Sequence, residues 1–320
     1  MMRVARLGLL VCVGVLGVLA LYSALGTLSA EHDYPPIGEF VEVDGVRLHY
    51  VDAGEGKPIV LLHGASSTLR EFTVSIVTNL SDSYRVIAFD RPGYGYSERP
   101  AGRWPDPAYQ ARLFRGALGQ LGVDQPILVG HSWSGSVALA YMLDYPEDVA
   151  GSVLLAGVSH PWEGGVYWTY DVAQIPVLGE LLAGTLLYPV GQLKLDDIAV
   201  EVFAPNAVVP GHLERTGAVL ALRPGTFLAN AEDVGQLSDY LRGQSQRYGD
   251  IERPLLLITG DSDGIVPPRN HAERLIKVAP WAQLEVLPNA GHALHHIYPE
   301  RVSALIKDFG RRVWDGKIGT

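Results

Sequence analysis

The sequence has one cysteine, a shortage of positive charge and few charged residues of either sign. Cys12 is the sole cysteine among 320 residues, which excludes an internal disulfide and a multi-thiolate metal site. Lysine and arginine total 25 against 35 aspartate and glutamate residues, so the formal net charge is −10. This sign is wrong for a protein that binds a phosphate backbone, and we expect no nucleic-acid partner.

The apolar surplus of the chain lies at its N-terminus, where residues 7–30 carry no charge. A membrane-spanning helix takes about 20 apolar residues, whereas the apolar part of a cleaved signal peptide has roughly 7–15. Arg3 and Arg6 precede the run and acidic residues follow it, which places the N-terminus in the cytoplasm and the rest in the periplasm or outside the cell. We predict a single-pass membrane anchor. The alternative is a signal peptide cleaved after residues 24–26, leaving a secreted or periplasmic protein.

The rest of the chain alternates short apolar runs with segments of helical period. Residues 40–52 alternate around Asp44-Gly45, as a hairpin with a two-residue turn requires. Six runs bounded by glycine or proline are predicted as buried strands: 59–62, 84–89, 126–129, 153–156, 255–259 and 283–287. Helices are expected at 109–121, 134–143, 270–278 and 299–309. This pattern predicts an α/β fold with a mostly parallel central sheet flanked by helices.

A long gap between the fourth and fifth of these runs breaks the alternation. Residues 160–249 are rich in leucine, glycine and aromatic residues and lack strand-like alternation, so we expect a mostly helical inserted cap. The expected division is a cytoplasmic terminus at 1–6, an anchor at 7–30, a linker at 31–37, a core at 38–159 and 250–314, the cap at 160–249 and a tail at 315–320.

A serine lies where a predicted strand runs directly into a predicted helix. Residues 130–135 read GHSWSG, and a serine between small residues at such a junction is typical of a nucleophile elbow. Strand and helix pass close together there, so the positions two before and two after Ser132 need to be almost free of side chain. Gly130 meets this condition fully, whereas Ser134 departs from the commoner glycine. Alone, the pattern also fits an ordinary N-cap serine.

Two later strands deliver a candidate acid and a candidate base. The strand at 255–259 runs into a segment that contains Asp261 and Asp263, and the strand ending near Leu287 is followed by His292. The carboxyl ends of parallel strands meet at one edge of a sheet, so these side chains are expected near the serine. The chain order of serine, aspartate and histidine is that of a known hydrolytic triad.

These motifs together resemble the α/β-hydrolase superfamily, in the branch with a lid between the sixth and seventh strands. The resemblance covers about residues 38–312 and rests on motifs at 63–64, 90–97, 130–135, 260–267 and 291–292. It implies Ser132 as nucleophile, His292 as base and Asp263 as acid. It also implies an oxyanion hole formed by the backbone amides of Ala65 and Trp133. Two competitors stay open: Asp261 for the acid and Ser134 for the nucleophile.

Four further residues are expected beside the substrate: His63, Gly64, His131 and Trp162. We expect His63 and His131 to pack and hydrogen-bond next to the elbow rather than to carry protons. An aromatic residue of the lid, such as Trp162, more often belongs to the core of the lid than to the substrate site.

A cluster of histidines raises the question of a metal. His295 and His296 follow His292 closely, but no carboxylate lies beside them at a spacing suited to a metal site. We therefore expect these histidines to begin a helix after the candidate base, with no metal and no cofactor.

A serine nucleophile narrows the reaction. Haloalkane dehalogenases and epoxide hydrolases of this fold use an aspartate at the elbow, so Ser132 disfavours both. We expect hydrolysis of a small carboxylic ester through an acyl-enzyme, with hydrophobic esters favoured by the apolar lid. Proline iminopeptidases share the Ser-Trp dipeptide but need lid carboxylates, for which Glu163, Asp171 and Glu180 are candidates. Cofactor-free perhydrolases and C–C bond hydrolases use the same triad and stay open, as does a non-catalytic binder on the same fold.

Overall fold

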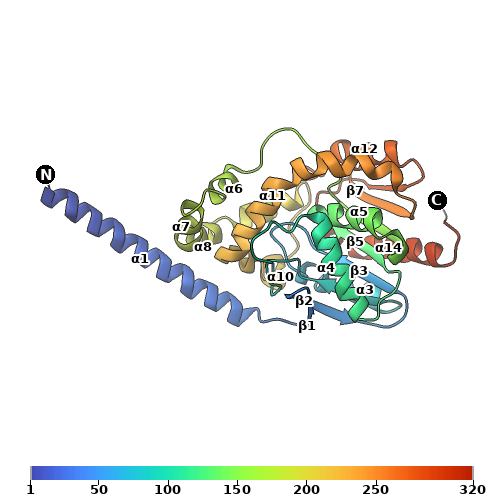
Figure 1. Ribbon diagram of the computed structural model, residues 1–320, viewed down its shortest axis with the longest axis horizontal. Coiled ribbons are helices and arrows are strands. Elements are labelled where there is room, and N and C mark those ends of the chain that lie inside the picture. Colours follow the sequence, from blue (N-terminus) through green and yellow to red (C-terminus); the bar gives the residue numbers. More distant parts are fainter. Residues whose placement is uncertain (1, 319–320) are drawn as a thin grey trace.

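Eight strands form a single mixed sheet in the computed structural model, which describes residues 2–318 (Figure 1). Met1 and the last two residues of the predicted tail, 319–320, lie outside the described residues. The strands are β1 (Glu39–Val43), β2 (Val46–Ala53), β3 (Pro58–Leu62), β4 (Arg85–Phe89), β5 (Ile127–His131), β6 (Gly151–Leu155), β7 (Leu255–Gly260) and β8 (Gln283–Leu287). Their order is β1-β2-β4-β3-β5-β6-β7-β8, and only the pairs made by β2 are antiparallel.

The antiparallel edge follows from a tight turn in the sequence. Val43 pairs with Val46 across Asp44 and Gly45, and both turn residues have positive φ, at 51° and 75°. A two-residue turn of this kind matches the right-handed twist of the flanking strands. The predicted hairpin is therefore confirmed, and it forms the edge of the sheet.

The central strands are buried on both faces because helices cover both. Along β3, Val60 and Leu62 pack in one hydrophobic cluster, whereas Ile59 and Leu61 pack in the other. This is the alternation expected when successive side chains point to opposite faces. The predicted α/β class, with a mostly parallel sheet between helical layers, is confirmed.

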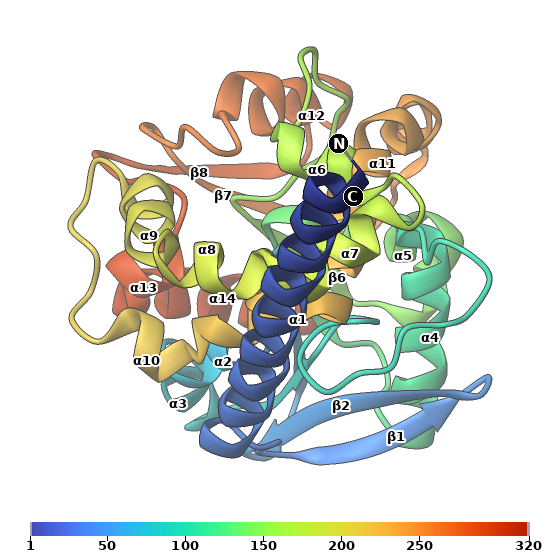
Figure 2. The ribbon, with the colours of Figure 1, turned by 90° about the vertical axis from the view of Figure 1, so that its left-hand side faces the viewer.

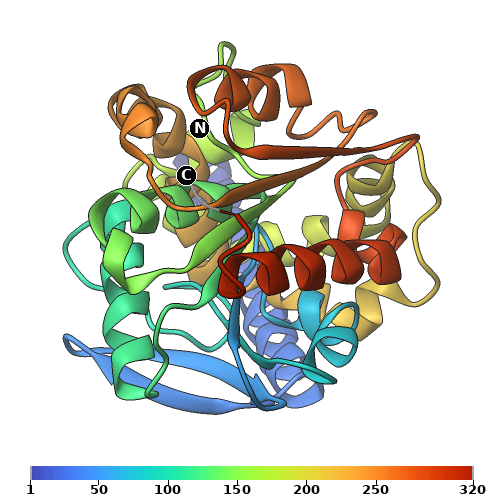
Figure 3. The ribbon, with the colours of Figure 1, turned by 90° about the vertical axis from the view of Figure 1, so that its right-hand side faces the viewer.

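The helices divide between the two faces. In Figure 3, α14 (red) and α2 with α3 (cyan) lie on one side of the sheet, and α4 with α5 (green) on the other. The helices of the core are α2 (Arg70–Thr73), α3 (Val77–Ser81), α4 (Pro107–Gln120), α5 (Gly135–Asp144), α12 (Ala272–Val278), α13 (Leu294–Ile297) and α14 (Pro299–Trp314). An N-cap fixes the start of α4, where the Asp106 side chain accepts a hydrogen bond from the backbone N–H of Tyr109.

A helical insertion connects β6 to β7. Its α-helices are α6 (Trp168–Ala173), α7 (Leu178–Thr185), α8 (Leu187–Gln192), α9 (Leu195–Phe203), α10 (His212–Thr216) and α11 (Pro224–Gln244). We refer to residues 156–254 as the insertion. The insertion begins at the carboxyl end of β6. It therefore leaves the sheet at the edge where the strand-to-helix turns gather.

The apolar N-terminal run forms one continuous helix, α1 (Met2–Asp33). It projects from the body of the molecule, and only its C-terminal part meets the insertion (Figures 1 and 2). A 28-residue stretch, Arg6–Asp33, is long and apolar enough to cross a membrane. Tyr22 packs edge-on against Tyr188 of α8, with ring centroids 6.1 Å apart.

Candidate active site

Ser132 occupies a strained turn between β5 and α5. Its φ is +50°, a value that residues with a side chain seldom adopt, and the short 3-10 helix Ser132–Ser134 follows at once. A methyl group on Gly130 would collide with Ser134 O, so the need for glycine two residues before the serine is met as predicted. Ser134 is tolerated two residues after it because its hydroxyl is buried and donates to His63 O at 2.5 Å. The turn thus holds the Ser132 side chain at the carboxyl end of the central strand.

The acid and base candidates form a hydrogen-bonded pair. His292 Nδ1 donates to Asp263 Oδ2 at 2.8 Å, and Asp263 Oδ1 accepts from the backbone N–H groups of Ile265 and Val266 at 2.9 and 2.8 Å. Burial raises the pKa of Asp263, but the neighbouring His292 and these hydrogen bonds outweigh it and keep the pKa below its ordinary value. The competing carboxylate, Asp261, is exposed and bonds Ser262 instead. The structure therefore pairs His292 with Asp263.

The peptide between Gly64 and Ala65 is held in one orientation. His63 Nδ1 donates to Gly64 O at 2.8 Å, and Arg91 Nη2 lies 3.5 Å from the same oxygen. In a trans peptide the N–H points opposite to the C=O, so the Ala65 N–H faces away from His63 and Arg91. A methyl group on Gly64 would lie 3.0 Å from Ser132 Cβ, which places this peptide next to the candidate nucleophile.

The second candidate oxyanion donor lies in the elbow itself. Ser132 O accepts from Val158 N at 2.9 Å, so the N–H of Trp133 points the opposite way. Trp133 is also in the first turn of a helix, where N–H groups have no partner within the helix. Among residues 2–318 the Ala65 amide donates no hydrogen bond to a backbone carbonyl, and the Trp133 amide lies in the first turn of its helix, so both are candidates to stabilise an anion.

The ring of His63 lies between the Gly64–Ala65 peptide and the backbone of Arg91. Its Nε2 accepts the backbone N–H of Arg91 at 2.9 Å while its Nδ1 donates to Gly64, so both ring nitrogens are occupied. The ring is completely buried, and this burial, together with the charge of Arg91, lowers the pKa of His63 to about 4. It is consequently neutral, and it fixes the Gly64–Ala65 peptide with no ring nitrogen left free for a substrate.

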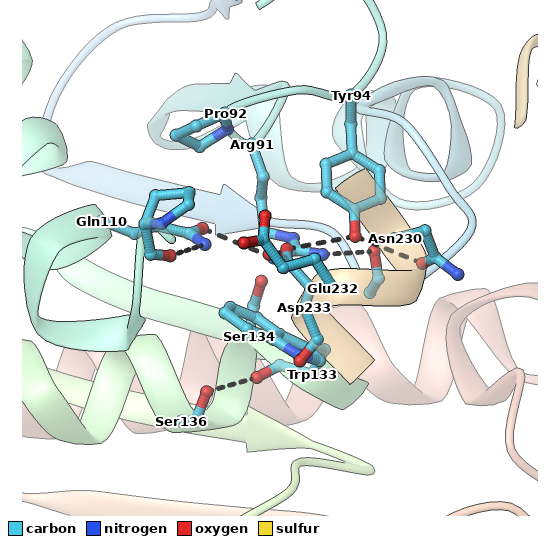
Figure 4. A network of polar contacts seen from close by, with 12 residues as sticks. Arg91, Pro92, Tyr94, Gln110, Trp133, Ser134, Ser136, Asn230, Glu232 and Asp233 are labelled. Atoms are coloured by element: carbon cyan, nitrogen blue, oxygen red, sulfur yellow. Dashed lines mark hydrogen bonds and ion pairs between the residues drawn. The ribbon is translucent and has the colours of Figure 1, made fainter. Parts of the chain in front are cut away.

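A buried ionic network lies behind the elbow (Figure 4). The guanidinium of Arg91 is stacked between Tyr94 and Trp133, 4.3 and 4.0 Å from their ring centroids, and donates to Asp233 Oδ2 at 2.9 Å. Asp233 also accepts from Tyr94 Oη at 3.1 Å, from Arg99 at 2.9 Å and from the Trp104 indole at 3.1 Å. Arg91 and Asp233 are both fully buried, and Asp233 comes from α11. The network thus connects α11 of the insertion to the loop that carries Arg91 and Tyr94.

The insertion hydrogen-bonds three segments of the candidate site. Asn230 Oδ1, on α11, accepts the N–H of Ser66 at 2.7 Å, one residue after Ala65. Trp133 Nε1 donates to Asp233 O at 3.0 Å. Val202 O, in α9, accepts the backbone N–H of His292 at 3.2 Å. The exposed fractions of Ser132, Asp263 and His292 are only 8, 4 and 5 %, so the candidate residues are buried.

A glutamate that the sequence did not reveal lies behind the candidate base. Glu71, on α2, is buried and lies 2.9 Å from His131 Nδ1 and 3.9 Å from His295 Nε2. The ring of His131 stacks on that of His292 with centroids 5.0 Å apart. Burial raises the pKa of Glu71, but His131 outweighs it and holds this pKa well below the ordinary range.

Glu71, His131 and His295 offer ligand atoms within 4.8 Å of one another and are the residues here that could hold a metal ion. The sequence argument against a metal relied on the lack of a carboxylate near His295, and that argument is wrong because Glu71 arrives from another helix. The expectation of a metal-free site stays a prediction.

Trp162 packs against the core beneath the insertion. It lies edge-on to His271 with ring centroids 6.3 Å apart, and its backbone N–H and C=O both bond Ser238 Oγ at 3.1 Å. These contacts place Trp162 between α11 of the insertion and the core.

Buried neutral histidines predict acid-sensitive stability. Burial is the first cause that lowers the pKa of four histidines, to about 4 for His63, His160 and His271 and about 3 for His296, from an ordinary 6.5. Below pH 6.5 the unfolded chain binds protons that the folded chain does not, so the stability is lost as the pH falls from 6.5 toward 4. Each group contributes up to about 1.4 kcal/mol per pH unit.

We therefore expect the free energy of unfolding in urea, followed by tryptophan fluorescence in non-ionic detergent, to fall steeply between pH 6.5 and 4.5. The His160→Gln variant should show a shallower slope. A free energy of unfolding that is the same at pH 7 and pH 5 would contradict this assignment.

Comparisons with known proteins agree with this geometry. The sequence profile of the α/β-hydrolase fold matches residues 57–299. A 2-hydroxymuconate semialdehyde hydrolase of Pseudomonas putida is 30 % identical over 294 residues, covering 88 % of this chain and 97 % of that protein. Haloalkane dehalogenase 2 of Mycobacterium bovis is 28 % identical over 292 residues, covering 87 and 96 %.

The structure of an α/β-hydrolase fold protein from Burkholderia ambifaria superimposes with a TM-score of 0.72 at 23 % identity, covering 85 % of this chain and 97 % of that one. Fold, strand order and the profile match, which spans more than half of the chain, all agree. The chain therefore belongs to the α/β-hydrolase fold family.

Proposed function

We propose that this hydrolase cleaves carboxylic esters through an acyl-enzyme formed on Ser132. The observation that carries the proposal is the convergence of three strand ends: β5 delivers a serine in an elbow, and β7 and β8 deliver the Asp263–His292 pair. Ser132 also argues against the dehalogenase reaction of the mycobacterial relative, since a serine at the elbow lacks the carboxylate that dehalogenases of this fold use.

The proposed mechanism follows from the hydrogen bonds. Because Nδ1 of His292 donates to Asp263, Nε2 is the nitrogen left to accept the proton of the Ser132 hydroxyl. The oxygen then attacks the ester carbonyl, and the amides of Ala65 and Trp133 stabilise the resulting oxyanion, at roughly 2.7 to 4 kcal/mol for one such donor. Imidazolium returns the proton to the leaving alcohol, and water repeats the sequence on the acyl-enzyme.

The surroundings favour a substrate without net charge. The two cations of the network behind the elbow, Arg91 and Arg99, are both paired with Asp233. A substrate carboxylate brought into this site would have to compete with Asp233 for them, at a considerable cost in desolvation. The carboxylates that an aminopeptidase would need do not face the site either, because Glu163, Asp171 and Glu180 are all exposed. Neutral esters with apolar acyl groups fit these features best.

The Pseudomonas putida relative favours one competing function, the hydrolysis of a 2-hydroxymuconate semialdehyde. That substrate bears a carboxylate and is cleaved at a bond other than an ester. The same triad could serve such a reaction, so the two proposals differ in the substrate and not in the nucleophile.

A substrate panel separates these functions. We expect the full chain, in non-ionic detergent, to hydrolyse p-nitrophenyl acetate, butyrate and octanoate, because the elbow and the oxyanion amides are built for acyl transfer. Initial rates are measured beside those for 2-hydroxymuconate semialdehyde and L-prolyl p-nitroanilide, with Ser132→Ala as the control. Turnover of the semialdehyde or the anilide with a higher kcat/KM than every ester would contradict the esterase proposal.

We further propose that α1 is a retained membrane anchor with the catalytic domain outside the cytoplasm. The basic residues Arg3 and Arg6 precede the apolar stretch, which favours a cytoplasmic N-terminus. The candidate cleavage site at residues 24–26 lies inside a helix whose Gly26 packs against the ring of Tyr188. Cleavage there would remove a helix that packs on the insertion.

A further inference from the structure

Exposed apolar side chains concentrate on two parts of the chain. Of the large hydrophobic residues with high exposure among the described residues, twelve belong to α1 and eleven to residues 167–200, which leaves five for all other segments. Within 167–200 the most exposed are Leu193 at 81 %, Val177 at 74 % and Trp168 at 72 %. A soluble monomer seldom exposes contiguous apolar surface on this scale, so such a surface indicates a partner.

Both parts lie at the same end of the molecule. Figure 1 shows α6, α7 and α8 at the end from which α1 projects, and Figure 2, viewed from that end, shows α7 and α8 beside α1. Specific contacts fix this arrangement: Tyr22 Oη donates to Gln192 Oε1 at 3.0 Å, and Ser23 is buried. We call the exposed apolar side chains of residues 167–200 the apolar face of the insertion.

The position of these contacts along α1 sets the level of a membrane. About 20 helical residues span the hydrocarbon core, and counting from Leu7, the first residue of the uncharged run, this takes α1 to Gly26. Tyr22 and Gly26 are the residues that meet Tyr188 of α8. The surface of a membrane crossed by α1 therefore passes through α7 and α8 instead of lying clear of the body.

We propose that the apolar face of the insertion docks into the outer surface of the lipid bilayer that α1 crosses. This inference rests on the anchoring role proposed for α1. Trp168 and Tyr167, 72 and 57 % exposed, are of the type that gathers at membrane interfaces, where an aromatic ring is half in lipid and half in water. Leu193 and Val177 supply aliphatic surface that gains free energy on leaving water.

The charges of the segment specify the lipid. Asp171, Glu180, Asp196 and Asp197 lie within residues 167–200, where the one basic residue, Lys194, is paired with Asp197 at 2.9 Å. With acidic residues in excess, the face has no electrostatic attraction to anionic headgroups, which recruit clusters of lysine and arginine. The partner that fits is a zwitterionic phospholipid surface, bound by the insertion of apolar groups.

Docking would place the candidate active site next to the lipid phase. The helix α9 carries Val200, 60 % exposed, and two residues later Val202, whose carbonyl accepts the backbone N–H of His292. One short helix thus joins the apolar face to the candidate base.

Nitroxide labels test the docking directly. In a Cys12→Ser background, the substitutions Val177→Cys, Leu193→Cys and Val286→Cys are labelled one at a time, and the full chain is placed in phosphatidylcholine nanodiscs, one copy per disc. Val286 is the matched control, because it is a valine, 48 % exposed, on β8 in the core. Electron paramagnetic resonance then measures the collision of each label with oxygen and with a water-soluble nickel complex.

We expect the ratio of oxygen to nickel collisions at positions 177 and 193 to be roughly tenfold above that at position 286, because lipid excludes the charged complex and not oxygen. Equal ratios at the three positions would overturn the proposal. Shielding seen only in discs with two copies would also overturn it, since a second chain would then be the partner. The labels report docking whether or not the protein cleaves esters, so failure of the esterase proposal leaves a different signature.

Discussion

Ser132→Ala should lower kcat/KM for p-nitrophenyl butyrate by roughly 10⁴- to 10⁶-fold, because removing a serine nucleophile leaves only the oxyanion amides and substrate binding. The substitution removes only the hydroxyl and keeps the Cβ that the turn at Ser132 already accommodates. The alanine variant should therefore fold normally. Steady-state kinetics and circular dichroism on the two purified proteins check both statements. Residual activity above a tenth of wild type would place the chemistry elsewhere.

Asp263→Asn should cost about 10⁴-fold in kcat, since an amide in place of the carboxylate no longer holds the Nδ1–H tautomer of His292. The chain offers a matched control two residues away. Asp261 is exposed and bonds only nearby groups, so Asp261→Asn should leave kcat unchanged. The two aspartates were both candidates on sequence alone, and equal effects of the two substitutions would refute the triad described here.

Asp233→Ala should destabilise the fold by about 3–5 kcal/mol, because it leaves the guanidinium of Arg91 buried without a counter-charge. Arg91 is fully buried between two aromatic rings and has no route to water. Equilibrium unfolding in urea, in non-ionic detergent at pH 7, measures this loss.

Two further variants locate the cause. The neighbour Glu232 has a side chain that is 36 % exposed and pairs with Arg99, so Glu232→Ala should cost less than about 1 kcal/mol. The double variant Arg91→Met with Asp233→Leu should be more stable than Asp233→Ala alone, since both charges are then gone. A double variant less stable than Asp233→Ala would show that the pair acts through packing and not through charge.

Local signals predicted the sheet and the triad candidates. Every predicted central strand lies within two residues of its observed bounds, because each is a short apolar run ended by glycine, proline or a polar turn. Ser132, Asp263 and His292 could be predicted from the sequence for the same reason. Each follows soon after such a strand, and parallel strands end at one edge of the sheet.

The helix predicted at 299–309 continues in the structure to Trp314. The missing side chain of Gly310 makes room for the ring of Trp314, which packs on Tyr84 with centroids 5.4 Å apart. This contact joins residues more than 200 positions apart, and no local window of sequence contains it.

The residues that support the candidate site could not be predicted from the sequence, for a related reason. Glu71, Asn230 and Asp233 carry no motif, and each acts on a partner from a distant segment: His131, Ser66 and Arg91, respectively. A buried carboxylate is recognisable only when its partner is known. The sequence could therefore indicate the candidate reactive groups, and not the groups that hold them in position.

The central claim, that Ser132 is an activated nucleophile, is tested most directly by labelling with a fluorophosphonate. The full-length chain in non-ionic detergent is treated with the probe, and tryptic peptides are analysed by mass spectrometry. We predict one phosphonate on the peptide that contains Ser132, with no labelling of Ser132→Ala and strongly slowed labelling of Asp263→Asn. A folded wild-type protein that stays unlabelled, or that carries the phosphonate on another residue, would contradict the account.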